Sequence, residues 1–165
     1  MLTKFMCGLV LMFMAWGVNA QVFRLDDSAS PRQRIMAPTV LSENGIALAA
    51  DRNAQFALLQ FGKVQFNLAT HAYKGRNAHI YYVIPASLSA LQSPSALQVQ
   101  WRSLGSFASG TAQSGSRTLV WTGRLLHDTL QETLDLSARL RLADTRLPYD
   151  GHFGFDSYFE IELLP

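Results

Sequence analysis

Two runs near the C-terminal end of the sequence alternate strictly between apolar and polar residues. In residues 134–142 every even position is a leucine or an alanine, and every odd position is polar. Residues 158–164 repeat the pattern, with Phe159, Ile161 and Leu163 separated by two glutamates. Successive side chains of a strand point to opposite faces, whereas a helix would mix the arginines of the first run with its leucines. Both runs are therefore predicted to be half-buried strands.

Upstream, residues 56–71 carry a strong β signal. The Gly62-Lys63 step in their middle fits either a hairpin with a tight turn or one long strand with a glycine bulge. Residues 79–84 are apolar on both parities, which predicts a central strand covered on both faces. Residues 97–102 alternate again, as a half-buried strand does.

The structure of the remaining segments is predicted mainly from residues that favour turns. Residues 118–122 are predicted to be a strand, and residues 126–131 a short connection. Residues 105–116 are rich in Gly and Ser, which favours a long flexible loop. Pro148 and the pair Asp150-Gly151 predict a turn between the two C-terminal strands.

About seven to nine short strands with turn signals between them, and no helix-length periodic segment, favour an all-β fold. This spacing predicts an antiparallel β-sandwich or barrel that spans residues 41–165. The predicted core follows from the inward parity of the strands and consists of Val64, Phe66, Leu68, Ile80, Tyr82, Leu97, Val99, Trp101, Leu134, Leu136, Leu140, Phe159 and Ile161.

Residues 1–20 have the anatomy of a secretory signal peptide. Lys4 precedes an apolar stretch over residues 5–16, and Val18-Asn19-Ala20 is a small-residue cleavage site. About 12 apolar residues are too few to span a bilayer, which takes ~20. We expect cleavage before Gln21, no membrane span afterwards, and a periplasmic, surface or secreted location.

The composition of the chain limits the kinds of binding site that can be expected. The single cysteine, Cys7, lies within the signal, so no disulfide or thiolate site is expected in the exported chain. The formal net charge of +2 gives no argument for nucleic acid. The four histidines lack metal-ligand spacing, and no cofactor is expected.

No catalytic motif stands out, and we expect that the protein is not an enzyme. Glu160 and Glu162 have the spacing of the paired carboxylates of glycosidases, but their parity places them on a solvated face. Trp101 shares the parity of a predicted core strand. Trp121 lies in a strand that is apolar on both parities, which makes it a weak candidate for a ligand platform.

Several short motifs coincide in the region from residue 56 to residue 164. They are the Phe61-Gly62 pair before an apolar strand, a tyrosine-rich strand ending in Ile84-Pro85-Ala86-Ser87, the run Val120-Trp-Thr-Gly-Arg-Leu125, and the Pro148/Gly151 turn. Together they resemble the pilin-like sandwich domains of bacterial fimbriae, namely the archaic and alternate chaperone–usher pilins and the spore-coat-U-type secreted domains. The chain departs from many such subunits by lacking their disulfide.

The resemblance implies that the fold is an immunoglobulin-like or pilin-like β-sandwich. It also implies a structural subunit of a fimbria or related surface structure, assembled by β-strand complementation. The implied partners are other copies or other fimbrial subunits, with a periplasmic chaperone and an outer-membrane usher. The alternative is a self-complete sandwich that serves as a periplasmic or surface binding module, for instance for glycans.

Residues 21–40 are predicted to be an extended N-terminal arm, interrupted by Pro31. Its candidate donor residues are Val22, Phe23, Leu25 and Ile35. The candidate acceptor edge is the last strand, with Tyr158, Phe159, Ile161 and Leu163. The arm either completes its own sheet or leaves to complete that of a neighbour, and the resemblance favours donation.

Overall fold

The computed structural model describes residues 21–31, 39–87, 91–146 and 155–165. These residues form two antiparallel sheets, as the alternating patterns predict, and the all-β sandwich expected from the sequence is confirmed. The predicted signal segment, Ile35 and the predicted Pro148 turn lie outside the described residues.

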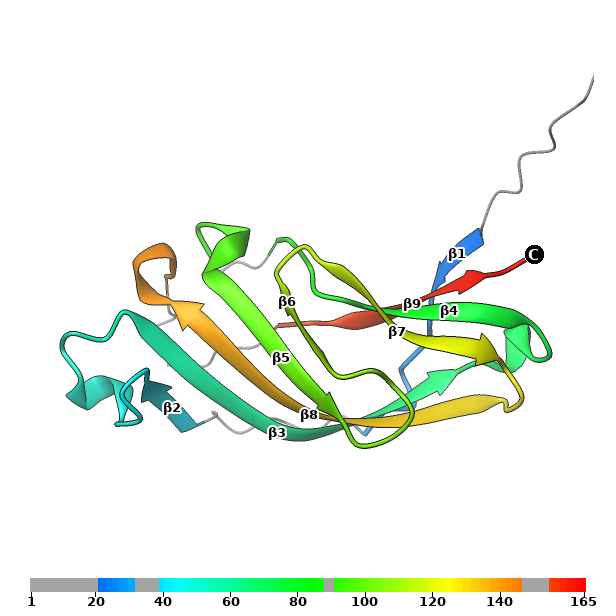
Figure 1. Ribbon diagram of the computed structural model, residues 1–165, viewed down its shortest axis with the longest axis horizontal. Helices are drawn as coiled ribbons and strands as arrows, with labels where there is room; N and C mark the ends of the chain where they lie inside the picture. Colours follow the sequence, from blue (N-terminus) through cyan, green and yellow to red (C-terminus); the bar gives the residue numbers. More distant parts are fainter. Residues whose placement is uncertain (1–20, 32–38, 88–90, 147–154) are drawn as a thin grey trace, which may run out of the picture.

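The first sheet has four strands in the order β1-β9-β4-β7, and the second has five in the order β2-β3-β8-β5-β6 (Figure 1). The strands are β1 Gln21–Arg24, β2 Thr39–Ser42, β3 Phe56–Ala69, β4 Asn77–Val83, β5 Leu97–Ser103, β6 Gly110–Gln113, β7 Arg117–Arg124, β8 Thr129–Arg141 and β9 Tyr158–Leu163. Short 3₁₀ turns occur at Leu48–Ala50, His71–Tyr73, Pro94–Ala96 and Leu142–Asp144.

The strand β3 resolves the open question about residues 56–71. It is one strand of 14 residues that pairs with β8 along its length, and the register shifts between Gln60 and Gly62. Gly62 has φ 73°, a conformation that glycine adopts without steric cost. The bulge reverses the parity, so that Leu59 before it and Phe66 after it both face the core.

The core lies between the sheets and agrees with the predicted set. All predicted core residues are buried except Val64, which is half-buried. Its centre is aromatic, with ring centroids 5.0 Å apart for Tyr82–Trp101, Tyr82–Phe159 and Phe66–Phe159. The hydroxyl of Tyr82 donates to Ser157 Oγ at 2.8 Å, and burial raises the pKa of the Tyr82 phenol to about 12.

Three details differ from the sequence predictions. The predicted loop 105–116 contains β6, which pairs with β5, and a buried Phe107. The predicted connection 126–131 is shorter, because β8 begins at Thr129. The central strand β4 buries only one face fully, since His79 and Tyr81 on the other face are half-exposed.

Candidate functional site

The N-terminal arm closes one long side of the sandwich. Strand β1 pairs antiparallel with β9, from Gln21 opposite Leu163 to Arg24 opposite Glu160. The main-chain N–H of Leu25 then donates to the carbonyl of Phe159 at 2.9 Å. In Figure 1, β1 lies beside β9 at the same end of the molecule. The predicted acceptor strand β9 is therefore covered on both sides, by β1 and by β4 of its own chain.

The arm continues onto the second sheet. The N–H of Ala69 donates to the carbonyl of Asp26, and the N–H of Asn67 donates to Ser30 Oγ, both at 2.9 Å. The hydrogen bond from the N–H of Ser28 lowers the pKa of the Asp26 carboxyl. Residues 21–30 thus bridge the edge of β9 in one sheet and the edge of β3 in the other.

Among the apolar side chains of residues 21–31, Leu25 is the most deeply buried. Leu25 is 2% exposed and belongs to the core, whereas Val22 and Phe23 are 47% and 40% exposed. Register places Phe23 on the inner face opposite Ile161, where its ring lies 5.7 Å from that of Tyr73. Val22 is opposite Glu162 on the outer face, so it is not an inward donor residue.

The candidate acceptor residues divide in the same way. Phe159 and Ile161 are fully buried, and Leu163 is half-buried against the core. Tyr158 faces outward, and the guanidinium of Arg24 lies 4.4 Å above its ring. Beside the arm lies a hollow of about 650 Å³, whose lining includes Arg24, Ser30, Val64, Phe66 and Tyr158.

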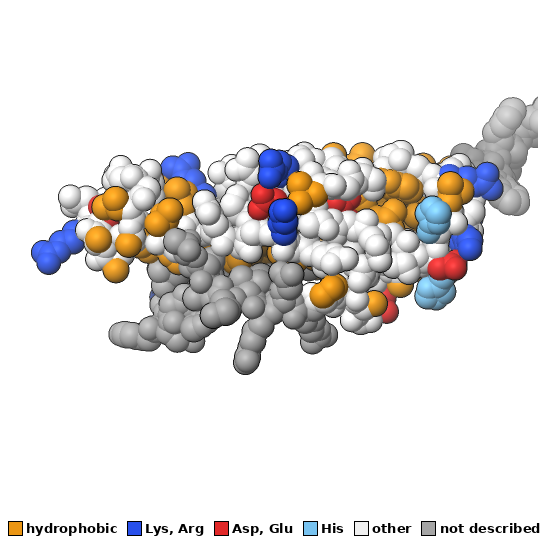
Figure 2. All heavy atoms as spheres, turned by 90° about the horizontal axis from the view of Figure 1, so that it is seen from below, with side chains coloured by type: hydrophobic (Ala, Val, Ile, Leu, Met, Phe, Trp, Pro, Cys, Tyr) orange, Lys and Arg blue, Asp and Glu red, His pale blue; other side chains and the backbone are white. Residues whose placement is uncertain are grey.

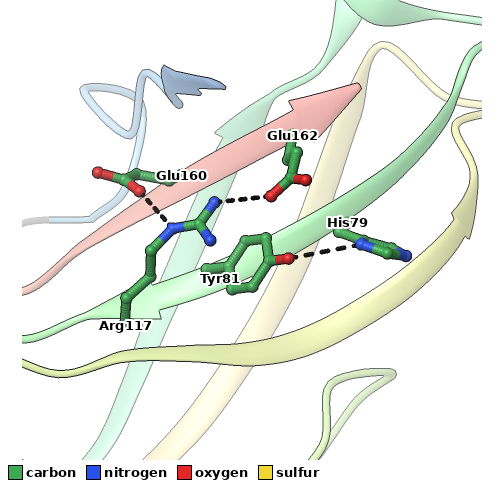
Figure 3. A network of polar contacts seen from close by, with 5 residues as sticks. All are labelled: His79, Tyr81, Arg117, Glu160 and Glu162. Atoms are coloured by element: carbon green, nitrogen blue, oxygen red, sulfur yellow. Dashed lines mark hydrogen bonds and ion pairs between the residues drawn. The ribbon is translucent and has the colours of Figure 1, made fainter. Parts of the chain in front are cut away.

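The outer face of the four-stranded sheet carries a polar network (Figure 3). Arg117 reaches from β7 across β4 and donates to Glu160 at 2.8 Å and to Glu162 at 3.1 Å. Its guanidinium also lies 3.3 Å from the ring centroid of Tyr81. The hydrogen bond from Arg117 lowers the pKa of the Glu162 carboxyl.

The contacts of this network can be compared with the requirements for a catalytic pair of carboxylates in a glycosidase. Glu160 and Glu162 lie on the outer face as predicted, and each is engaged by the same arginine. A general acid for glycoside cleavage needs a raised pKa. A carboxyl of lowered pKa, such as that of Glu162, has the opposite property.

A second hollow, of about 340 Å³, lies where β7 runs into the start of β8. Its apolar lining consists of Trp121, Leu125, Leu126 and Leu130, and its polar lining consists of Thr70, Ser106, Arg124, His127, Thr129 and Gln131. Trp121 is half-buried and pairs in register with the buried Ile80, so its indole faces the space between the sheets. A methyl group at Gly123 would lie only 3.0 Å from this indole. We call this hollow the Trp121 pocket.

A buried carboxylate that sequence reasoning missed holds the neighbouring loop. Glu132 is 2% exposed and accepts hydrogen bonds from the N–H groups of Ser106 and Phe107, at 2.8 and 2.9 Å. Ser103 Oγ donates to the same carboxylate at 3.1 Å. The signal was present in the sequence, because position 132 shares the parity of the buried leucines of β8.

Charged side chains of both signs lie on the surface of the molecule. On the face seen in Figure 2, basic and acidic side chains are interspersed among uncharged ones. Among the residues that the structure describes, no three His, Cys, Asp or Glu side chains gather as a metal site would require. Within the same residues, no helix has the length and apolar character needed to cross a membrane.

Comparison with known proteins adds no relative. No protein-family model, no curated protein and no solved structure matches this chain.

Proposed function

We propose that this chain is a structural subunit of a bacterial surface fibre, exported to the periplasm and assembled by β-strand complementation. The observation that carries the proposal is the origin of the strand beside β9. The order β2-β3-β8-β5 corresponds to strands A-B-E-D of an immunoglobulin domain, and β4-β9 corresponds to C-F. The neighbouring position, which strand G occupies in such domains, is taken by the N-terminal strand β1.

An N-terminal strand in this position can serve its own chain or another. Its contacts with β9 are the hydrogen bonds of an antiparallel ladder, which an identical arm from a second copy would make equally well. The connection from the arm to β2 runs through residues 32–38, outside the described residues. An arm exchanged between copies would keep the contacts that residues 21–30 make with β9 and β3.

Release of the arm would expose few buried side chains. Burial of one leucine side chain contributes about 1.5–3 kcal/mol, and among residues 21–31 only Leu25 has a fully buried side chain. Without the arm, β9 would present an unpaired edge above the buried Phe159 and Ile161. Such an edge readily pairs with another chain, which accounts for the periplasmic chaperone and outer-membrane usher that we propose as assembly partners.

A self-contained binding module is the second candidate. It is favoured by the Trp121 pocket and by the hydrogen bonds that the arm makes to both sheets of its own chain. In neither case do we propose an enzymatic activity.

The two candidates are separated by removing the arm. We compare the exported chain, whose mass should correspond to a start at Gln21, with a chain that lacks residues 21–30. Light scattering is measured over rising concentration, and a peptide of residues 21–31 is added to the truncated chain. Complementation predicts oligomers of the full-length chain and stoichiometric capture of the peptide by the truncated one.

The opposite pattern would refute the proposal. It consists of a full-length chain that stays monomeric at high concentration and a truncated chain that neither folds nor binds the peptide. A scrambled peptide of the same composition serves as the matched control. If it bound as tightly as the native peptide, the register seen between β1 and β9 would not be the basis of capture.

A further inference from the structure

We propose that the Trp121 pocket binds a saccharide that carries a carboxylate, with the sugar ring against the indole and the carboxylate beside Arg124. None of residues 21–31 lines this pocket, so the proposed binding does not depend on strand complementation. It would give the subunit a ligand-binding function in addition to its structural one.

The size and lining of the pocket suit a small ligand. Binding pockets are typically ~300–1,000 Å³ and combine an apolar lining with a few polar groups that fix the orientation of the ligand. The Trp121 pocket, at about 340 Å³, has this mixture. The electron-rich face of an indole attracts the partly positive C–H groups on one face of a sugar ring. Gly123 leaves the space in which this indole lies.

The polar lining suits hydroxyl groups and a negative charge. The amide of Gln131 and the hydroxyl of Thr129 both donate and accept hydrogen bonds, as sugar hydroxyls require. Arg124 and His127 also line the pocket, and no Asp or Glu is among its lining residues. The nearby Asp128 is paired with Lys74 at 3.0 Å. A carboxylate on the ligand would therefore meet an arginine without facing a carboxylate of the lining.

The pocket is held in shape by hydrogen bonds across its wall. The N–H of Gly75 donates to the carbonyl of Leu125 at 2.7 Å, and Arg124 Nε donates to the carbonyl of Gly75 at 2.9 Å. Thr70 Oγ1 donates to the carbonyl of His127 at 2.8 Å. A site that is already formed loses less entropy when a ligand binds.

The test is a titration of the ¹⁵N-labelled chain of residues 21–165, followed through its two indole N–H signals. The probes are D-glucuronate and D-glucose, which share a ring and differ in the carboxylate. We expect glucuronate to shift the signal of Trp121 and to leave that of Trp101, whose indole is buried and donates to the carbonyl of Ala108. Glucose should bind about tenfold more weakly, as the loss of one charge-assisted hydrogen bond implies.

Substitutions show which residues bind the sugars. The affinities of the Trp121 variants are measured by calorimetry. Trp121→Ala should abolish the binding of both sugars, whereas Trp121→Phe, which keeps an aromatic ring, should retain part of it. Arg124→Gln should reduce glucuronate binding to the level of glucose. Gln100→Ala, an exposed change on the outer face of the other sheet, should leave both affinities unchanged.

Three results would overturn the proposal. One is the absence of any shift of the Trp121 signal with glucuronate to about 50 mM, a range that detects even millimolar binding. Another is equal binding of glucose and glucuronate. The third is undiminished binding of glucuronate to a folded Trp121→Ala chain.

Discussion

Glu132 and Phe107 are joined by a hydrogen bond of 2.9 Å, in which a buried carboxylate accepts a main-chain N–H. The same carboxylate accepts the N–H of Ser106 at 2.8 Å, so it satisfies two donors of a loop that has no strand partner there. Gly105 passes so close that a methyl group on it would lie 2.7 Å from Glu132 Oε1. One acidic side chain of β8 therefore fixes the path of residues 105–107.

Replacing Glu132 by leucine should destabilise the protein by about 2–4 kcal/mol. The buried N–H of Phe107 and the partly buried N–H of Ser106 would both lose their acceptor. Glu132→Gln should cost less, since the amide keeps one acceptor oxygen. The measurement is urea unfolding of the exported chain. Asp135→Ala serves as the control, because its ion pair with Arg102 is exposed and should contribute within about 1 kcal/mol. Equal losses at positions 132 and 135 would contradict this role of Glu132.

The alternation of inward and outward side chains along β8 leads to a second prediction. Leu136 is 5% exposed and faces the core, so Leu136→Ala should cost about 2–5 kcal/mol as a cavity mutation. Arg139 lies on the outer face, where its guanidinium is 3.6 Å from the ring centroid of Phe56. Arg139→Ala should therefore cost only about 0.5–1 kcal/mol. Chemical unfolding of both variants tests which face of β8 is buried. A greater loss of unfolding free energy at Arg139 than at Leu136 would reverse this assignment.

Local alternation was sufficient to predict the all-β fold, and every predicted core residue except Val64 is buried. It missed other buried residues, among them Leu25, Leu59 and Leu125. It succeeded at β5, β8 and β9 because each of these strands has one solvent-exposed face and one buried face. Polar and apolar residues therefore alternate in the sequence. The bulge in β3 could be proposed from Gly62 but not chosen over a hairpin, because both place a glycine there. Strand β6, Gly110–Gln113, has no apolar alternation of its own and exists through its pairing with β5.

The candidate sites were less accessible to such reasoning. Arg117 meets Glu160 and Glu162 only because β4 separates β7 from β9 in the sheet order, which no local pattern specifies. The partners of Glu132 are main-chain groups of a distant loop, and the sequence does not display main-chain donors. Trp121 could be singled out, but the residues that surround it come from three separate segments of the chain.

The Arg117 network should appear in the dependence of stability on pH. The hydrogen bond from Arg117 lowers the pKa of Glu162 below its ordinary value of 4.5 in the folded protein. The unfolded chain then binds a proton more readily at this site, so the contribution is present above pH 4.5 and is lost as the pH falls through the folded pKa. A ¹³C titration of the Glu162 carboxyl should show the lowered value, and Arg117→Gln should move it back towards 4.5. An unchanged titration in the variant would exclude Arg117 as the cause.

The last prediction concerns the anchor of the arm. Leu25 and Val22 are both aliphatic residues of the same short segment, but Leu25 is 2% exposed and Val22 is 47% exposed. If the arm is exchanged between copies, its affinity should depend on the inward residue and hardly on the outward one. A peptide of residues 21–31 with Leu25→Ala should bind the arm-deleted chain at least about 30-fold more weakly than the native peptide, as the loss of a buried leucine implies. The matched peptide with Val22→Ala should bind within about threefold, since it removes little buried surface. Calorimetry of the two peptides separates side-chain anchoring from backbone pairing, because both peptides keep every main-chain group. Equal losses for the two peptides would mean that the arm docks in a register other than Phe23 opposite Ile161. In that case the register seen between β1 and β9 would not be the one in which the peptide is captured.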